Sequence, residues 1–166
     1  MEESERSFIK IEPSDLERLA LLSREDREEF FSRHPKWQRR YSGRILCIAL
    51  CQGGAVHYVN GENGVKDFDI WTFYAEHPDA TFPWRLRRTK DYGLSKFGKH
   101  PDDVGYIGRR VDLLARSLRC ALTADPVQCI RSYLAAGRTK TARELSLKAV
   151  VLIEPQELMG QIIWPQ

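Results

Sequence analysis

The chain has 166 residues, of which 42% are hydrophobic and 30% charged, with a formal net charge of +3. This length suffices for one hydrophobic core, and the balance is that of a globular protein rather than a disordered or membrane-spanning one. Four cysteines without a Cys-x-x-Cys pair argue against a structural zinc site. The acidic start lacks the apolar stretch of a signal peptide, so we expect one cytoplasmic domain over residues 1–166, with no membrane partner.

Helical signals dominate the early part of the chain, residues 13–44. Ser14 precedes Glu17 at the spacing of a capping box, and residues 23–26 repeat the cap signal. A third apolar stripe follows over residues 36–44. The pattern predicts three short helices.

Three segments predict strands. Residues 45–51 are continuously apolar and bounded by glycines, which is typical of a fully buried strand, although a buried helix fits the same pattern. Residues 65–74 alternate in polarity and are rich in aromatic and branched side chains, and residues 110–116 form a third candidate. Between these two, residues 76–108 carry several prolines and glycines, which predicts a long functional loop.

The C-terminal part predicts two helices and an apolar end. Asp125, followed by a proline, is typical of a helix start, and a second helix is expected after a cap at Thr139 or Thr141. Residues 149–153 and 161–164 fit closing strands or apolar extensions. The complete pattern predicts an α/β (α+β) fold, with a mixed β-sheet flanked by helices.

Three aspartates lie within the predicted strands. Asp67 and Asp69 are two apart, so their side chains share one face of a strand, and Asp112 is a third aspartate in apolar surroundings. Carboxylates at such spacing repel each other unless a cation lies between them, and a hard divalent ion such as Mg²⁺ prefers carboxylate oxygen. If the two strands are neighbours, the three carboxylates converge on one metal site. Alternatively, the first two form ion pairs with Lys66 or an arginine, and Asp112 pairs with the adjacent arginines.

Candidate phosphate-binding groups flank these aspartates. Gly53 and Gly54 follow the first predicted strand, where glycines let a backbone approach a phosphate, although such a pair is usually only a turn. Basic residues gather over residues 84–90 and 95–99, and they suit either a triphosphate or a solvated surface. Trp84 is a candidate for stacking on a base.

The ordered combination of these motifs resembles the DNA polymerase beta-type nucleotidyltransferase superfamily. The motifs are Cys51-Gln52-Gly53-Gly54 after one strand, Asp67-Phe68-Asp69-Ile70 on a second and Val111-Asp112-Leu113 on a third. The resemblance covers residues 45–115, and Gly54 stands where many members carry serine. Residues 64–71 and 108–112 also resemble a small bacterial family, which implies no substrate.

The resemblance implies a nucleotidyltransferase-like mixed sheet and two Mg²⁺ ions, with Mn²⁺ as an alternative. Asp67 and Asp69 would be metal ligands, and Asp112 would be a third ligand that helps to deprotonate the acceptor hydroxyl. The resemblance and the basic residues near these motifs together suggest the following candidate nucleotide-binding residues: Gly53, Gly54, Lys66, Arg88, Lys96 and Arg110.

The expected activity is transfer of a nucleoside monophosphate from a nucleoside triphosphate to an unidentified hydroxyl acceptor, with release of pyrophosphate. So small a domain leaves little room for acceptor recognition, and a homodimer or protein partner could complete the site. The alternative is a non-catalytic module of the same fold that binds nucleotide, RNA or a protein partner.

Overall fold

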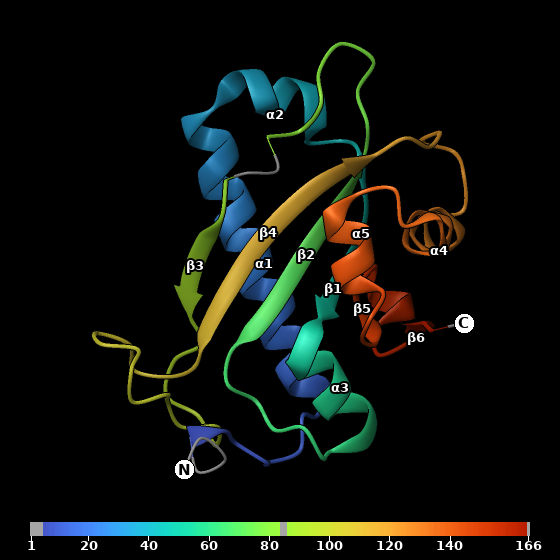
Figure 1. Ribbon diagram of the computed structural model, residues 1–166. Helices are drawn as coiled ribbons and strands as arrows, with labels where there is room; N and C mark the ends of the chain where they lie inside the picture. Colours follow the sequence, from blue (N-terminus) through green and yellow to red (C-terminus); the bar gives the residue numbers. More distant parts are fainter. Residues whose placement is uncertain (1–4, 84–85, 166) are drawn as a thin grey trace.

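A six-stranded mixed sheet forms the centre of the protein, as seen in a computed structural model that describes residues 5–83 and 86–165 (Figure 1). The strand order is β3-β4-β2-β1-β5-β6. β2 and β4 are parallel, and the other neighbouring strands are antiparallel. The strands are β1 (Ile45–Cys51), β2 (Phe68–Ala75), β3 (Arg88–Asp91), β4 (Arg110–Leu118), β5 (Val150–Glu154) and β6 (Ile162–Trp164). The helices are α1 (Pro13–Arg33), α2 (Pro35–Tyr41), α3 (Gln52–Asn60), α4 (Pro126–Ala136), α5 (Lys140–Leu145) and the 3₁₀ turn η2 (Gln156–Leu158).

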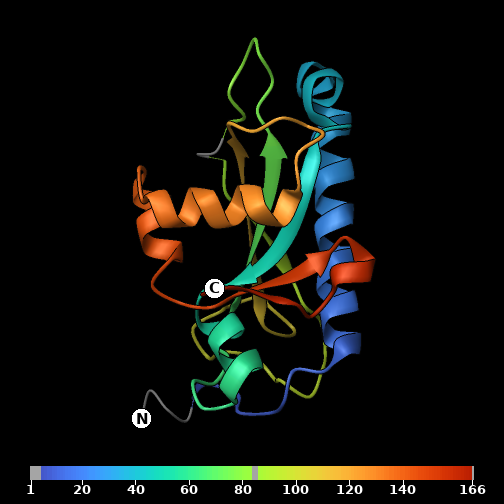
Figure 2. The same cartoon turned by 90° about the vertical axis from the view of Figure 1, so that its right-hand side faces the viewer.

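The predicted α/β fold with helices flanking a mixed sheet is confirmed. Figure 2 shows the sheet nearly edge-on, with α1 on one side and α4 on the other. One core cluster, which includes Leu16, Leu50 and Ile70, joins the sheet to α1. A second, which includes Phe73 and Ile130, joins it to α4. Because both faces are covered in the middle of the sheet, the residues of β1 after Ile45 are all buried, which explains its unbroken apolar sequence.

The N-terminal region differs from the prediction, because α1 is one continuous helix of 21 residues. It begins after Glu12, whose backbone N–H donates to the Asp15 carboxylate at 2.7 Å, so Ser14 is not the cap. Ser23 and Asp26, which look like a second cap in the sequence, are buried within the helix. A cap signal is local, and here the apolar stripe that continues to Phe30 keeps the chain helical through it.

The predicted loop over residues 76–108 contains a strand. β3 pairs antiparallel with β4 and forms the edge of the sheet. Its sequence is Arg-Thr-Lys-Asp, without the apolar alternation of a half-buried strand, and this is why the sequence does not reveal it. Trp84, the candidate for base stacking, lies outside the described residues.

The C-terminal elements follow the prediction closely. Asp125 caps α4 by accepting a hydrogen bond from the Val127 N–H at 3.1 Å. Thr139, rather than Thr141, caps α5 by accepting one from Ala142 N–H at 3.0 Å. The two apolar segments at the end of the chain are the strands β5 and β6. Among the described residues, no helix is long and apolar enough to cross a membrane.

Candidate metal centre

Asp67, Asp69 and Asp112 come together at the start of the parallel pair β2 and β4. Asp69 is the second residue of β2 and lies directly beside Asp112 in the parallel register. Adjacent strands lie about 4.8 Å apart, so this register makes the two carboxylates neighbours. Asp67 immediately precedes β2, and oxygens of all three carboxylates lie within 4.8 Å of one another.

The three carboxylates lie on the face of the sheet opposite α1. Phe68 and Ile70 belong to the core cluster beneath α1, so Asp69, which lies between them, points the other way. Val111 and Leu113 flank Asp112 in the same manner. Figure 1 looks onto this face, where the lower ends of β2 and β4 lie in front of α1 and are not covered by α4 or α5.

Two arginines contact the acidic cluster. The Arg110 guanidinium lies 2.9 Å from an Asp67 oxygen, 3.0 Å from Asp112 and 3.3 Å from Asp103. Arg87 reaches Asp112 at 2.7 Å. Among the described residues, four carboxylates, counting Asp69, therefore lie around two guanidiniums, and the charges of Lys66 and Arg109 also act on Asp67.

Asp69 is the carboxylate that this arrangement leaves uncompensated. No side chain of the described part of the chain forms an ion pair with it, whereas Asp67 pairs with Arg110 and Asp112 pairs with both Arg87 and Arg110. Burial, and then the negative charges of Asp67 and Asp112, raise the pKa of Asp69 to about 7. The pKa of Asp67 is also raised, mainly by burial and by Asp112, despite the opposing effect of Arg110. A divalent cation fits such a donor set, because it supplies the missing positive charge through oxygen ligands.

The glycine pair lies in the first turn of α3, next to the same end of the sheet. β1 ends at Cys51, which pairs with Asp69, and α3 follows at once. A side chain at Gly53 would come within 2.8 Å of the Asn63 amide, and one at Gly54 within 3.2 Å of Leu50. Both glycines are therefore tightly packed against neighbouring side chains, and their proposed contact with phosphate remains a prediction.

Two of the candidate phosphate-binding residues lie elsewhere. Arg88 makes a bidentate ion pair with Asp26 of α1 at 2.8–2.9 Å, because its position beside Leu113 directs it to the α1 face. Lys96 lies 2.8 Å from Glu12 and 2.9 Å from Asp15, at the first turn of α1. The structure does not bring these two residues to the carboxylates.

Lys66 and Arg110 do lie beside the carboxylates. Lys66 is exposed, and its charge partly offsets the raised pKa of Asp67. Arg87 belongs to the basic segment 84–90 that the sequence offers as counter-charge for a triphosphate, whereas Asp103 is a member of the cluster that sequence reasoning did not single out, since it comes from a loop segment. Arg110 lies two positions before Asp112 on the same strand, and that spacing is a signal that it shares the face of the aspartates.

The placement of Arg88 predicts a structural rather than a nucleotide-binding role. We expect Arg88→Met to lower the free energy of unfolding by about 2 kcal/mol, because it leaves the buried Asp26 carboxylate without its charged partner. Lys90→Met, at the next position on the same face of β3, is the control. Its ammonium lies 3.8 Å or more from Glu25 and Glu29, so its loss should cost about 0.5 kcal/mol or less. Chemical denaturation measures both, and weaker triphosphate binding by Arg88→Met at unchanged stability would contradict this role.

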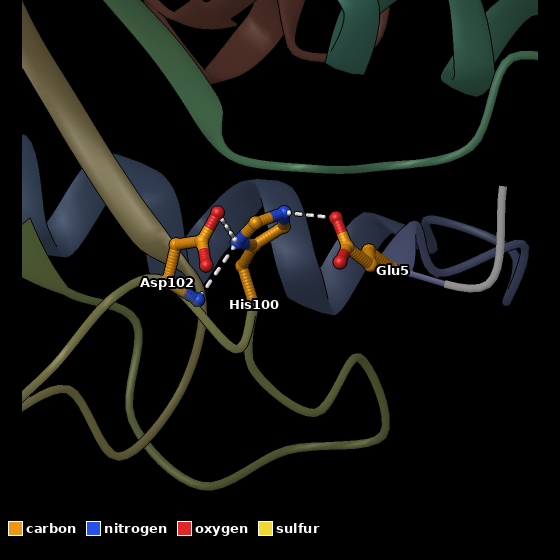
Figure 3. Close-up of side chains that lie close together, drawn as sticks. All are labelled: Glu5, His100 and Asp102. Atoms are coloured by element: carbon orange, nitrogen blue, oxygen red, sulfur yellow. Dashed lines mark hydrogen bonds and ion pairs between the residues drawn. The ribbon is translucent and has the colours of Figure 1, made fainter. Parts of the chain in front are cut away.

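A second group of potential metal ligands, Glu5, His100 and Asp102, lies on the N-terminal segment and the loop after β3 (Figure 3). The buried His100 ring donates through Nε2 to the Glu5 carboxylate at 3.0 Å. Its Nδ1 accepts a hydrogen bond from the Asp102 backbone N–H at 3.1 Å. Since both ring nitrogens have protein partners, the group fits a hydrogen-bonded link between distant segments better than a metal site.

Searches against protein-family models, curated proteins and solved structures returned no match. Function is therefore inferred from the geometry of the acidic cluster.

Proposed function

We propose that the protein is a magnesium-dependent nucleotidyltransferase, which moves a nucleoside monophosphate from a nucleoside triphosphate to a hydroxyl acceptor. The observation that carries this proposal is Asp69. It is a largely buried carboxylate beside Asp67 and Asp112, with no counter-charge of its own among the described side chains and a pKa raised to about 7. Such a carboxylate is costly to keep in a fold unless a cation binds to it.

Asp67, Asp69 and Asp112 would hold the Mg²⁺, as one or two ions, and Mn²⁺ is an alternative with the same preference for oxygen. When bound, the metal neutralises charge on the triphosphate and lowers the pKa of the acceptor hydroxyl. In the proposed reaction the acceptor oxygen bonds to the α-phosphorus, and the bond from that phosphorus to the pyrophosphate oxygen breaks. The hydroxyl proton passes to Asp112 and then to solvent, the role that the resemblance implies for this residue.

The two arginines of the cluster supply cationic groups for the phosphates. The Arg87 side chain is 54% exposed while one of its nitrogens lies 2.7 Å from Asp112, so its guanidinium is accessible to a ligand at the carboxylates. Arg110 is held among Asp67, Asp103 and Asp112. A guanidinium can bind two phosphate oxygens at once, and here Asp103 would keep Arg110 oriented toward them.

One observation favours the alternative, a module of this fold that binds a ligand without catalysis. Arg110 and Arg87 already neutralise Asp67 and Asp112, as would be expected of a cluster that holds no metal. Asp69, which forms no ion pair with any described side chain, favours the enzyme.

Calorimetry distinguishes the two proposals. Titration of the protein with each nucleoside triphosphate should show binding that requires Mg²⁺, and incubation with an α-labelled triphosphate and a cell extract should transfer label to an acceptor with release of pyrophosphate. Triphosphate binding of equal strength in EDTA, together with no transfer of label, would favour the non-catalytic module.

A further inference from the structure

A cavity of about 910 Å³ lies at the far end of β4, between that strand, α4 and the start of α5. Its volume is in the range of sites for small molecules. Its wall includes Arg116 and Leu118 of β4, Cys129 and Tyr133 of α4, and Thr139 at the cap of α5. None of these residues belongs to the acidic cluster.

The cavity and the acidic cluster lie on the same face of the same strand. Side chains at positions 112, 114, 116 and 118 of β4 alternate with those that face α1, so Asp112 and Arg116 point to the same side of the sheet. Leu114 lies between them on this face and is only partly buried. Asp112 and Arg116 are four positions apart on β4, which corresponds to about 13 Å along a strand. In Figure 1, β4 runs from its lower end upward past α5.

Arg116 presents a charged group that the surrounding residues hold in place. Its guanidinium donates to the Thr141 hydroxyl at 2.8 Å and lies 6.0 Å from the centre of the Tyr133 ring. The Tyr133 hydroxyl is in turn 2.7 Å from the Thr139 hydroxyl. A guanidinium fixed in this manner, half-buried beside an aromatic ring, is suited to a carboxylate or phosphate group on a small ligand.

The remaining polar groups of the wall are consistent with an anionic ligand. Arg138 adds positive charge at the rim, whereas Arg119 is paired with Glu76. The acids of the wall have other partners, because Glu76 contacts Ser117 and Arg119, and Asp125 caps α4. The exposed side chains Gln128 and Ser132 offer hydrogen bonds to hydroxyl groups.

We propose that this cavity binds the hydroxyl acceptor, and that the acceptor is a small sugar or polyol bearing a phosphate or carboxylate group. The anionic group binds Arg116, and a hydroxyl at the other end of the molecule reaches the carboxylates at the start of β4. The assignment as acceptor rests on the proposed transferase function, whereas binding of the anion in the cavity does not.

The test is a titration followed by NMR, on the full chain without triphosphate or metal. The probes are ribose 5-phosphate, glucose 6-phosphate and glucuronate, with ribose and glucose as neutral matches. We expect at least one anionic probe to shift the Arg116 side-chain signal and the backbone signals around Tyr133 and Thr139 in a saturable manner, and the neutral sugars to leave them unchanged. Arg116→Gln should weaken that binding about tenfold or more, the usual effect of losing a charge-assisted hydrogen bond.

The results distinguish failure of the proposed transferase function from failure of the proposed binding site in the cavity. Wild-type protein that binds the anionic probe at these residues but transfers no label contradicts only the transferase function. The proposal for the cavity is overturned if neutral and anionic sugars shift the same signals equally. It is also overturned if no probe shifts them, or if the shifts map to Arg87 and Arg110 instead. These outcomes are read on the wild-type protein and do not depend on whether Arg116→Gln folds.

Discussion

Replacing both Asp67 and Asp69 by asparagine is expected to abolish magnesium-dependent triphosphate binding and to reduce nucleotidyl transfer by roughly 10³-fold or more, since bound metal contributes several kcal/mol to such a transition state. Asparagine keeps the size of each side chain but removes two of the three negative charges that would hold the ion. Arg110 then retains Asp103 and Asp112 as partners, so the fold should persist.

Calorimetry with and without Mg²⁺, and release of pyrophosphate, measure the effect. Asp102→Asn is the matched control. It removes one carboxylate from the loop that also carries Asp103, and the Asp102 side chain is 86% exposed. It should change neither triphosphate affinity nor transfer. Equal magnesium-dependent binding by the double variant and the wild type would refute the assignment of this cluster as the metal site.

The stability of the metal-free protein is expected to decrease as pH rises, because of Asp69. Its pKa is about 7 in the folded protein and near the ordinary value of 3.8 in the unfolded chain. The folded state therefore holds the proton more tightly, and the stability that Asp69 contributes in acid is lost between about pH 4 and pH 7. At 1.36 kcal/mol for each pKa unit, the loss is at most about 4 kcal/mol. Asp67, whose pKa is also raised, acts in the same direction.

Chemical denaturation in EDTA near pH 5 and near pH 8 measures this loss. Asp69→Asn should remove most of the pH dependence and make the metal-free protein more stable than the wild type near pH 8. Addition of Mg²⁺ to the wild type should have a similar effect, because an ion bound only to the folded state stabilises it. If the wild type and Asp69→Asn lose the same stability between the two pH values, Asp69 does not carry an uncompensated charge.

Much of the fold can be predicted from local patterns. The apolar run of β1, the alternation of β2 and the caps at Asp125 and Thr139 each have a physical cause within a few residues of chain. The two elements that local patterns predict wrongly, α1 and β3, depend instead on contacts with distant parts of the chain. α1 runs through the apparent cap at Ser23 because its apolar stripe packs on the sheet, and β3 exists because β4 offers a partner for its backbone.

The sequence by itself determined which side of each strand carries a carboxylate, because alternation along a strand is a local property. It also placed Arg110 on the face of Asp112. Only the tertiary structure decided that Asp69 and Asp112 lie side by side, and that Arg88 turns to Asp26 instead of the cluster. Residues so far apart in the chain meet through strand order and register, which depend on the packing of the whole sheet rather than on the residues that surround each aspartate.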